Sequence, residues 1–273
     1  MPHLIPRAVW AGLACWIALS APAHALELRG SIREGGLLRG QVPPGSSVDL
    51  AGESVPVGPD GHFLIGFGRQ APERVTLRVH QPDGSQRRRT LAVDQRTYRT
   101  QRISGLPSDQ VHPDAEALTR IRREQARVEA ARGHRSRLPA FWSDFIWPAT
   151  GPVTGVYGTR RILNGAPRQP HFGVDIAVPA GTPIRAPAGG VVRMAAPDLF
   201  FSGGTLILDH GHGLSSSFLH LRRFHVRVGE RVSQGQVLAE SGATGRATGP
   251  HLDWRINLRD KRLDPALVAG PMP

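Results

Sequence analysis

The sequence predicts a mostly β protein of two parts joined by a helix. Short β-rich runs separated by turns fill residues 26–105, a stretch of helical period follows within 106–137, and a region dense in Gly, Val and Pro occupies 138–273. A chain of 273 residues is long enough for two modest domains. Five of the 12 histidines fall between His210 and His251, so we expect the chemistry to lie in the last part.

Residues 1–25 have the composition of a secretory signal peptide. Arg7 is their only charged residue, an apolar run covers Ala8–Leu19, and the small-residue pattern before Ala25 predicts cleavage after that residue. This apolar run is short for a membrane span, and no later run approaches 18 apolar residues. We therefore expect an exported protein without a stable membrane span.

Cys15 is the only cysteine and would leave with the signal peptide. A lipoprotein anchored at Cys15 is the alternative, which Gly12 and the continuing apolar run disfavour. The mature chain then has no disulfide and no thiolate ligand, so any metal must be held by nitrogen and oxygen.

The formal net charge is +12, and Lys261 is the only lysine among the basic residues. A basic exported protein suits an anionic surface such as cell wall, membrane headgroups or nucleic acid, although codon bias explains the arginine excess equally well. Arginine-rich stretches, the densest being Gln86–Thr90, contain no interleaved aromatic residues. We therefore expect no nucleic-acid partner.

The N-terminal part, residues 26–105, is expected to form a small antiparallel β-sandwich. Its strand-like runs are separated by Pro-Asp-Gly turns. They are Val48–Leu50, His62–Phe67 and Arg74–Val79. Because this part holds no cluster of catalytic residue types, we interpret it as an accessory or positioning module.

One segment, Pro113 to Ala131, has a helical period. Leu118, Ile121 and Val128 recur among Arg and Glu, and Gly133 follows. We expect a charged amphipathic helix that is solvated and bridges the two parts, with partner binding as the alternative.

The run Pro170–Val178 carries the first candidate site residues. His171 and Asp175 are four residues apart, and the β-branched residues around them favour a strand on which both lie on one side with Gly173. This arrangement is a reasonable half of a metal site. Taken alone, an ordinary hydrogen-bonded His-Asp pair explains it as well.

Two further strand-like runs carry histidine or aspartate. His220 lies between apolar residues in Ser215–Leu221, where a buried histidine bonded to a backbone carbonyl is the simplest interpretation. His251 and Asp253 are two residues apart and share one face by strand period. Three strands that each present His or Asp predict a common site.

The run from about Phe145 to Pro265 resembles the lysostaphin-type (LytM-like) zinc metallopeptidases, which cut peptidoglycan peptides. That family has a glycine-bearing start, then H-x-x-x-D, an aromatic-x-H-L strand and T-G-x-H-x-H. This chain matches it with Gly155–Gly158, His171 and Asp175, Phe218–Leu221 and Thr248–His251. The resemblance implies an antiparallel β-sheet platform with an open groove whose floor carries the metal.

The resemblance also implies roles for individual residues. His171 and Asp175 resemble Zn²⁺ ligands, and His220 and His251 resemble the catalytic histidines. Asp253 stands where the family has its third ligand, a histidine, so an oxygen ligand would replace nitrogen.

Zn²⁺ binds carboxylate oxygen and imidazole nitrogen at similar distances, so coordination survives this change. The charge does not survive it, because two carboxylates and one imidazole make the zinc complex formally neutral instead of +1. From the ligands alone we expect weaker acidification of water, a slower or metal-shifted enzyme, and easier acceptance of Mn²⁺.

The functional prediction is an exported, periplasmic zinc endopeptidase that acts on peptidoglycan cross-links, D-Ala–diaminopimelate by analogy or a glycine bridge. The alternative is a catalytically degenerate relative that binds cell wall or activates another hydrolase. Which of His220 and His251 is the general base stays open. His210 and His212, in Asp-His-Gly-His-Gly, are interpreted as structural turn residues and not as a second metal pair.

Overall fold

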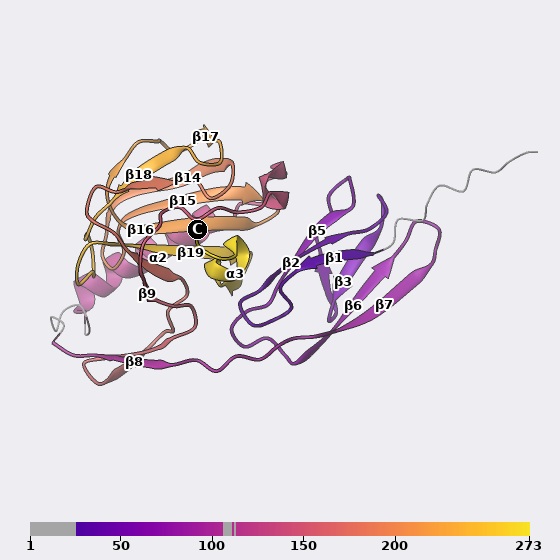
Figure 1. Cartoon of the computed structure of the whole chain (residues 1–273), viewed down its shortest axis with the longest axis horizontal. Coiled ribbons are helices and arrows are strands. Elements are labelled where there is room, and N and C mark those ends of the chain that lie inside the picture. The colour runs from indigo at the N-terminus through magenta and orange to yellow at the C-terminus, as the bar shows by residue number, and fades with distance from the viewer. Residues whose placement is uncertain (1–25, 106–110, 112) are drawn as a thin grey trace, which may run out of the picture.

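The computed structural model describes residues 26–105, 111 and 113–273 (Figure 1). The predicted signal peptide lies outside these residues. Two β regions are joined by a long extended segment, and the smaller one is N-terminal. The prediction of a mostly β fold is confirmed. Among the described residues, no helix is both long and apolar enough to cross a membrane.

The N-terminal region is built from two antiparallel sheets, one in the order β1-β2-β5 and one in the order β4-β3-β6-β7. The strands are β1 (Glu27–Gly30), β2 (Leu37–Gln41), β3 (Ser47–Leu50), β4 (Glu53–Val55), β5 (His62–Gly66), β6 (Arg74–His80) and β7 (Gln86–Ala92). Their inward side chains, including Leu38, Phe63 and Leu77, form one buried cluster. Strand period therefore places the apolar residues of both sheets in a shared core, as expected for a sandwich.

The sandwich is docked on the C-terminal region. Leu37 and Leu64 turn away from the sandwich core and join the larger cluster that contains Leu263. Arg96, which follows the sandwich, donates to Asp264 at 2.8 Å. The N-terminal module thus contributes apolar side chains to the core beneath the C-terminal sheet.

The chain crosses between the two regions as β8 (Thr100–Ile103), which pairs in parallel with β10 (Arg160–Leu163) beside β11 (Ala166–Arg168). Sequence patterns predicted none of these three strands. The strands β10 and β11 form a tight hairpin whose turn residues, Asn164 and Gly165, both have positive φ.

The predicted helix exists as α2 (Ala115–Arg132), capped by Asp114, which accepts from the Ala117 amide. The expectation of a solvated bridge is incomplete. Val128 and Ala131 pack against a cluster on β14 and β15, and buried Glu124 accepts from the Phe200 amide at 2.8 Å. The helix therefore covers one face of the C-terminal sheet.

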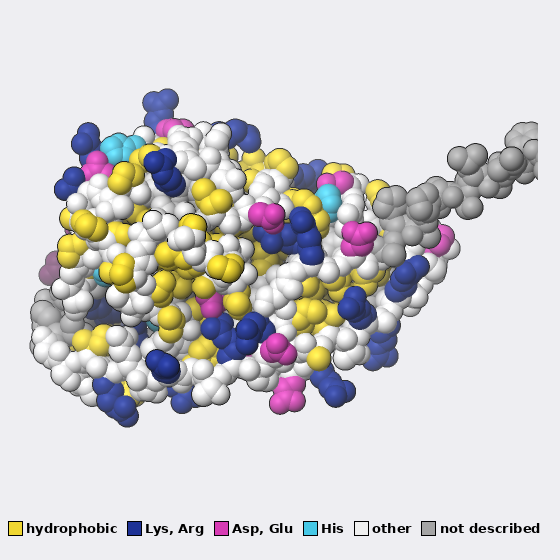
Figure 2. All heavy atoms as spheres, viewed as in Figure 1, with side chains coloured by type: hydrophobic (Ala, Val, Ile, Leu, Met, Phe, Trp, Pro, Cys, Tyr) yellow, Lys and Arg dark blue, Asp and Glu magenta, His cyan; other side chains and the backbone are white. Residues whose placement is uncertain are grey.

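That sheet is antiparallel throughout and has the main order β17-β14-β15-β16-β19-β12-β9, with β13, β18 and β20 attached. The strands are β9 (Val153–Gly155), β12 (Val174–Ala177), β13 (Pro183–Arg185), β14 (Gly190–Leu199), β15 (Gly203–Gly211), β16 (Leu214–Phe224), β17 (Arg231–Val232), β18 (Val237–Ser241), β19 (His251–Leu258) and β20 (Lys261–Leu263). Two short helices, η1 (Pro139–Trp142) and α3 (Pro265–Ala269), flank it. Figure 2 shows Lys and Arg side chains spread over both regions on the surface of the molecule that is visible in this view.

Candidate metal centre

Strand β19 separates core residues from site residues by its period of two. Leu252, Trp254 and Ile256 have no exposed surface and pack in the core. His251 and Asp253, which alternate with these core residues, therefore project from the opposite face of the sheet. The predicted site residues of this strand thus share one face.

Pairing between β12 and β19 brings the two predicted carboxylate ligands together. Asp175 lies directly opposite Asp253 in the antiparallel register. Side chains at such positions lie on the same face and are close neighbours. His171, in the loop before β12, completes the group.

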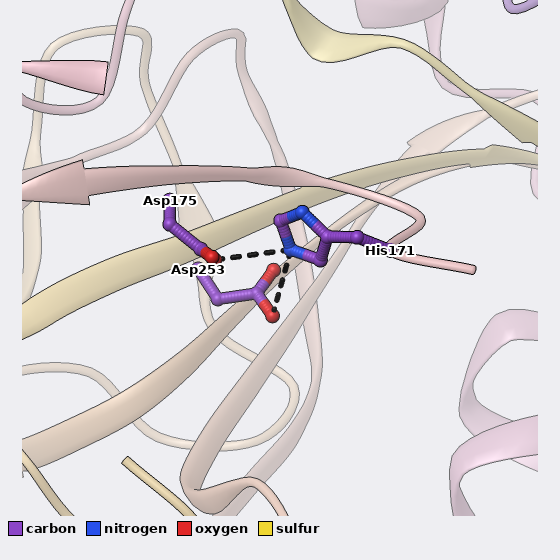
Figure 3. A group of neighbouring side chains, drawn as sticks. All are labelled: His171, Asp175 and Asp253. Atoms are coloured by element: carbon purple, nitrogen blue, oxygen red, sulfur yellow. Dashed lines mark ion pairs between the residues drawn. The ribbon is translucent and has the colours of Figure 1, made fainter. Parts of the chain in front are cut away.

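The three predicted ligands converge on one point (Figure 3). His171 Nε2 lies 3.0 Å from Asp175 Oδ1 and 3.5 Å from Asp253 Oδ2. One ligand atom from each residue lies within 4.8 Å of the other two. His171 and Asp253 are each 2% exposed, whereas the Asp175 side chain is 14% exposed, so the group opens to solvent on the side of Asp175.

Three atoms of this group are buried without a directed hydrogen bond, namely His171 Nδ1, His171 Nε2 and Asp175 Oδ1. Buried polar atoms are normally satisfied, and a bound cation would satisfy the facing pair of His171 Nε2 and Asp175 Oδ1. One imidazole and two carboxylates, with no thiolate, make a donor set that Zn²⁺ accepts in catalytic sites. The residues present therefore fit a zinc ion.

Glycines make room for the carboxylates. A Cβ added at Gly155 would overlap the Asp175 carboxylate, and one at Gly173 would lie 2.7 Å from Asp253 Oδ1. The distance from the added Cβ at Gly155 is 2.1 Å, to Asp175 Oδ2, and both distances are shorter than real Cβ contacts. Larger residues at these two positions would therefore displace the carboxylates.

Each carboxylate also binds an arginine that sequence reasoning did not single out. Arg161 Nη2 lies 3.1 Å from Asp175 Oδ2. Arg255 binds both oxygens of Asp253, with Nε 2.9 Å from Oδ1 and Nη2 2.5 Å from Oδ2. Strand period alone places Arg255 on the face of Asp253, and this was the available signal. Arg161 reaches Asp175 from the unpredicted hairpin strand β10, so no sequence spacing indicated it.

These neighbours control the ionisation of the group. Burial by itself would raise the pKa of Asp253, but the charges of Arg255 and His171 outweigh it and hold this pKa well below its usual value. Burial by itself would lower the pKa of His171, but the carboxylates of Asp253 and Asp175 outweigh it and raise this pKa. Asp253 is thus available as an anionic ligand.

The two predicted catalytic histidines lie side by side, with ring centroids 4.6 Å apart. His220 Nδ1 is 2.8 Å from the Thr244 carbonyl oxygen, and His251 Nδ1 is 2.8 Å from the Gly249 carbonyl oxygen. A carbonyl only accepts, so each Nδ1 donates and Nε2 is the ring nitrogen that stays available. Burial is the main cause that lowers the pKa of His220, which keeps its ring neutral.

His220 also has an unusual backbone. Its φ of 64° lies in the left-handed region, within a stretch where the pairing of β16 is irregular. A non-glycine residue rarely adopts this conformation, and such residues concentrate at functional sites.

His210 and His212 lie apart from this group. His210 is fully buried, with Nδ1 2.7 Å from the Gly189 carbonyl oxygen and Nε2 2.9 Å from Ser216 Oγ. His212 stacks on Phe141 with ring centroids 4.0 Å apart. Both contacts are those expected of structural histidines.

Comparisons with known proteins indicate one family. Residues 169–265 match the model of peptidase family M23. The peptidoglycan DD-endopeptidase ShyA of Vibrio cholerae is 37% identical over 103 residues, which are 38% of this chain and 24% of ShyA. The DD-carboxypeptidase/endopeptidase Mpg of Neisseria meningitidis is 36% identical over 103 residues, again 38% of this chain and 24% of that protein. The matches thus span about a quarter of these curated relatives.

A solved structure resembles almost the whole chain. It is a putative peptidase M23 from Pseudomonas aeruginosa, with 32% identity and a TM-score of 0.67. The similarity covers 88% of this chain and 96% of that one, and so includes the N-terminal region. The chain belongs to peptidase family M23.

Proposed function

We propose that this chain is an exported zinc endopeptidase that hydrolyses peptide cross-links of bacterial peptidoglycan. The observation that carries the proposal is the convergence of His171, Asp175 and Asp253 on one buried point of the sheet face that also bears His251. The curated relatives named as peptidoglycan endopeptidases support this substrate class. The bond we expect is D-Ala–diaminopimelate, and a glycine bridge is the alternative.

In this proposal His171, Asp175 and Asp253 hold the zinc ion, which when bound acidifies water and polarises the scissile carbonyl. Three protein ligands leave a fourth position open, as catalytic zinc sites require. Arg161 and Arg255 hold the two carboxylates in place through the oxygens that they bind.

His220 and His251 supply the proton chemistry. Because each Nδ1 is tied to a carbonyl oxygen, each ring is fixed in orientation with Nε2 as its reactive atom. One histidine accepts a proton from the attacking water at Nε2 and later passes it to the leaving amine. The other takes up a proton from solvent before the reaction and donates a hydrogen bond from Nε2 to the oxyanion. His220 is also buried, at 6% exposure, so the packing around it limits the movement of its ring.

The proposed location is the periplasm, and it rests on the signal peptide predicted over residues 1–25. The proposed division of the mature chain is a β module over 26–105, a helical connection over 106–137 and the peptidase domain over 138–273. The shared core around Leu37 and Leu64 supports a module that is held against the peptidase domain.

The test is digestion of purified sacculi by the purified protein, with and without a chelator, with soluble products identified by mass spectrometry. We expect cross-linked fragments to be converted to monomers, loss of this conversion with chelator, and recovery with Zn²⁺. No conversion under any divalent ion, together with retained binding to sacculi, would favour the degenerate wall-binding alternative.

A further inference from the structure

Arg255 is the group outside the three proposed ligands that most directly controls Asp253. Its guanidinium makes contacts of 2.9 and 3.2 Å from Nε and 2.5 Å from Nη2 to the two carboxylate oxygens. Both residues project from the same face of β19, two positions apart. A two-pronged contact of this kind fixes the plane of the carboxylate as well as its position.

The pair is built into the site. A Cβ at Gly173 would lie 2.7 Å from both Asp253 Oδ1 and Arg255 Cγ, so this glycine leaves the space that the pair occupies. Asp253 Oδ2, which binds Arg255, is also the oxygen that faces His171 at 3.5 Å. The arginine therefore acts on the oxygen nearest the proposed metal position.

Charge explains why an arginine accompanies this aspartate. A histidine at position 253 would be a neutral ligand, whereas Asp253 brings one negative charge into a buried site. Arg255 brings one positive charge to the same carboxylate, so the two side chains together are neutral. Counting only the three ligands gives a formally neutral zinc complex that acidifies water less. That count leaves out the positive charge of Arg255.

We propose that Asp253 and Arg255 work as one neutral ligand unit, in which Arg255 is a positioning residue that orients the carboxylate and restores the charge of a histidine-containing site. This inference rests on the proposed zinc site. It makes position 253 and position 255 interdependent: an aspartate ligand requires the arginine, and a histidine ligand excludes it.

A different ion pair in the same sheet provides the comparison. Arg193 binds Asp209 at 3.0 Å, with side chains 24% and 3% exposed, against 24% and 2% for Arg255 and Asp253. The Arg193 pair bridges β14 and β15 and contacts none of the proposed ligands. Loss of Arg193 should therefore affect stability without a specific effect on metal binding.

The experiment measures Zn²⁺ affinity by competition with a chromogenic chelator, and site geometry from the visible absorption of bound Co²⁺. The proteins are the wild type, Arg255→Gln, Asp253→His and the double variant. We expect Arg255→Gln to bind Zn²⁺ about 10–100-fold more weakly. We expect Asp253→His alone to bind at least about tenfold more weakly, because the guanidinium is left unpaired beside the cation. The Zn²⁺ affinity of the double variant should return to within about threefold of the wild-type value. Its histidine ligand is neutral, and no guanidinium remains beside the cation.

Two further variants separate positioning from folding. Arg255→Lys keeps the charge but not the two-pronged geometry, so it should regain part of the affinity while its Co²⁺ spectrum stays altered. Arg193→Gln should leave both the affinity and the spectrum unchanged. Circular dichroism of each variant without metal checks that the fold is retained.

Asp253→His binding as tightly as the wild type, with no further gain in the double variant, would overturn the inference. Equal losses from Arg255→Gln with aspartate or histidine at position 253 would also overturn it, because Arg255 would then be only structural. A wild type that binds no Zn²⁺ would overturn the proposed zinc site as well, so the two failures are distinguishable.

Discussion

His171 and His210 are both almost fully buried in the C-terminal region, at 2% and 0% exposure, yet their surroundings differ in kind. Both ring nitrogens of His210 have protein partners, and burial lowers its pKa to about 4. His171 faces two carboxylates that raise its pKa, and its Nε2 has no directed hydrogen bond. Unsatisfied polar atoms, and not burial, distinguish the proposed ligand from the structural histidine.

The largest expected effect of a mutation is that of His171→Ala. Removal of a ligand should weaken zinc binding by more than about 100-fold, beyond the effect of losing an indirect partner, and should abolish hydrolysis. Zinc content and sacculus digestion measure both effects. His225→Ala is the control, because His225 is a partly exposed histidine bonded to Glu240. Equal zinc content in the two variants would contradict the assignment.

His220→Gln should separate chemistry from metal binding. Loss of a positioned proton-transfer group should reduce the turnover rate by about 10²–10⁴-fold while zinc content stays at one ion per chain. The measurement is the rate of cross-link cleavage at saturating zinc. Unchanged turnover, or loss of zinc, would remove His220 from the catalytic role.

His210 should make the free energy of unfolding depend on pH. Its folded pKa of about 4 is below the value of about 6.5 expected when unfolded, so its contribution is complete above about pH 6.5 and is lost as the pH falls toward 4. Between these values the wild type should lose about 3 kcal/mol more unfolding free energy than His210→Gln. Urea unfolding at pH 7 and pH 4 provides the test, and parallel pH profiles would refute it.

Gly173 lies beside the proposed ligands and Gly189 lies beside His210, and we expect a smaller difference in zinc affinity when each is replaced by alanine. A Cβ at Gly173 would lie 2.5 Å from the Trp254 carbonyl oxygen, whereas one at Gly189 would have its nearest contact at 3.4 Å. Gly173→Ala should therefore weaken zinc binding by about tenfold through displacement of Asp253, within the range of indirect perturbations. Gly189→Ala, beside His210, should leave zinc affinity unchanged. Equal affinities in the two variants would show that the space at Gly173 is not needed.

Much of this architecture could be predicted because it follows local periods. The expected runs beginning at His62 and Arg74 became β5 and β6, since Pro-Asp-Gly turns mark strand ends. The three proposed ligands were identified because strand period and the family motif agree. In the structure these three side chains lie together, and their role as ligands stays a prediction.

The missed features depend on tertiary pairing. The strand β8 pairs with β10 across about 60 residues of chain, and no local pattern encodes that partner. The contact of Arg161 with Asp175 follows from the same hairpin. The sequence predicts that Glu124 is a solvated charge on α2. In the structure it is buried and accepts a hydrogen bond from the Phe200 amide.

The central claim is that His171, Asp175 and Asp253 hold one divalent cation. Diffraction from crystals grown with Zn²⁺, recorded above and below the zinc absorption edge, tests it most directly. We predict a single anomalous peak within about 2.0–2.2 Å of His171 Nε2 and of one oxygen from each aspartate. A map with no peak there, or with the peak among other residues, would contradict the account.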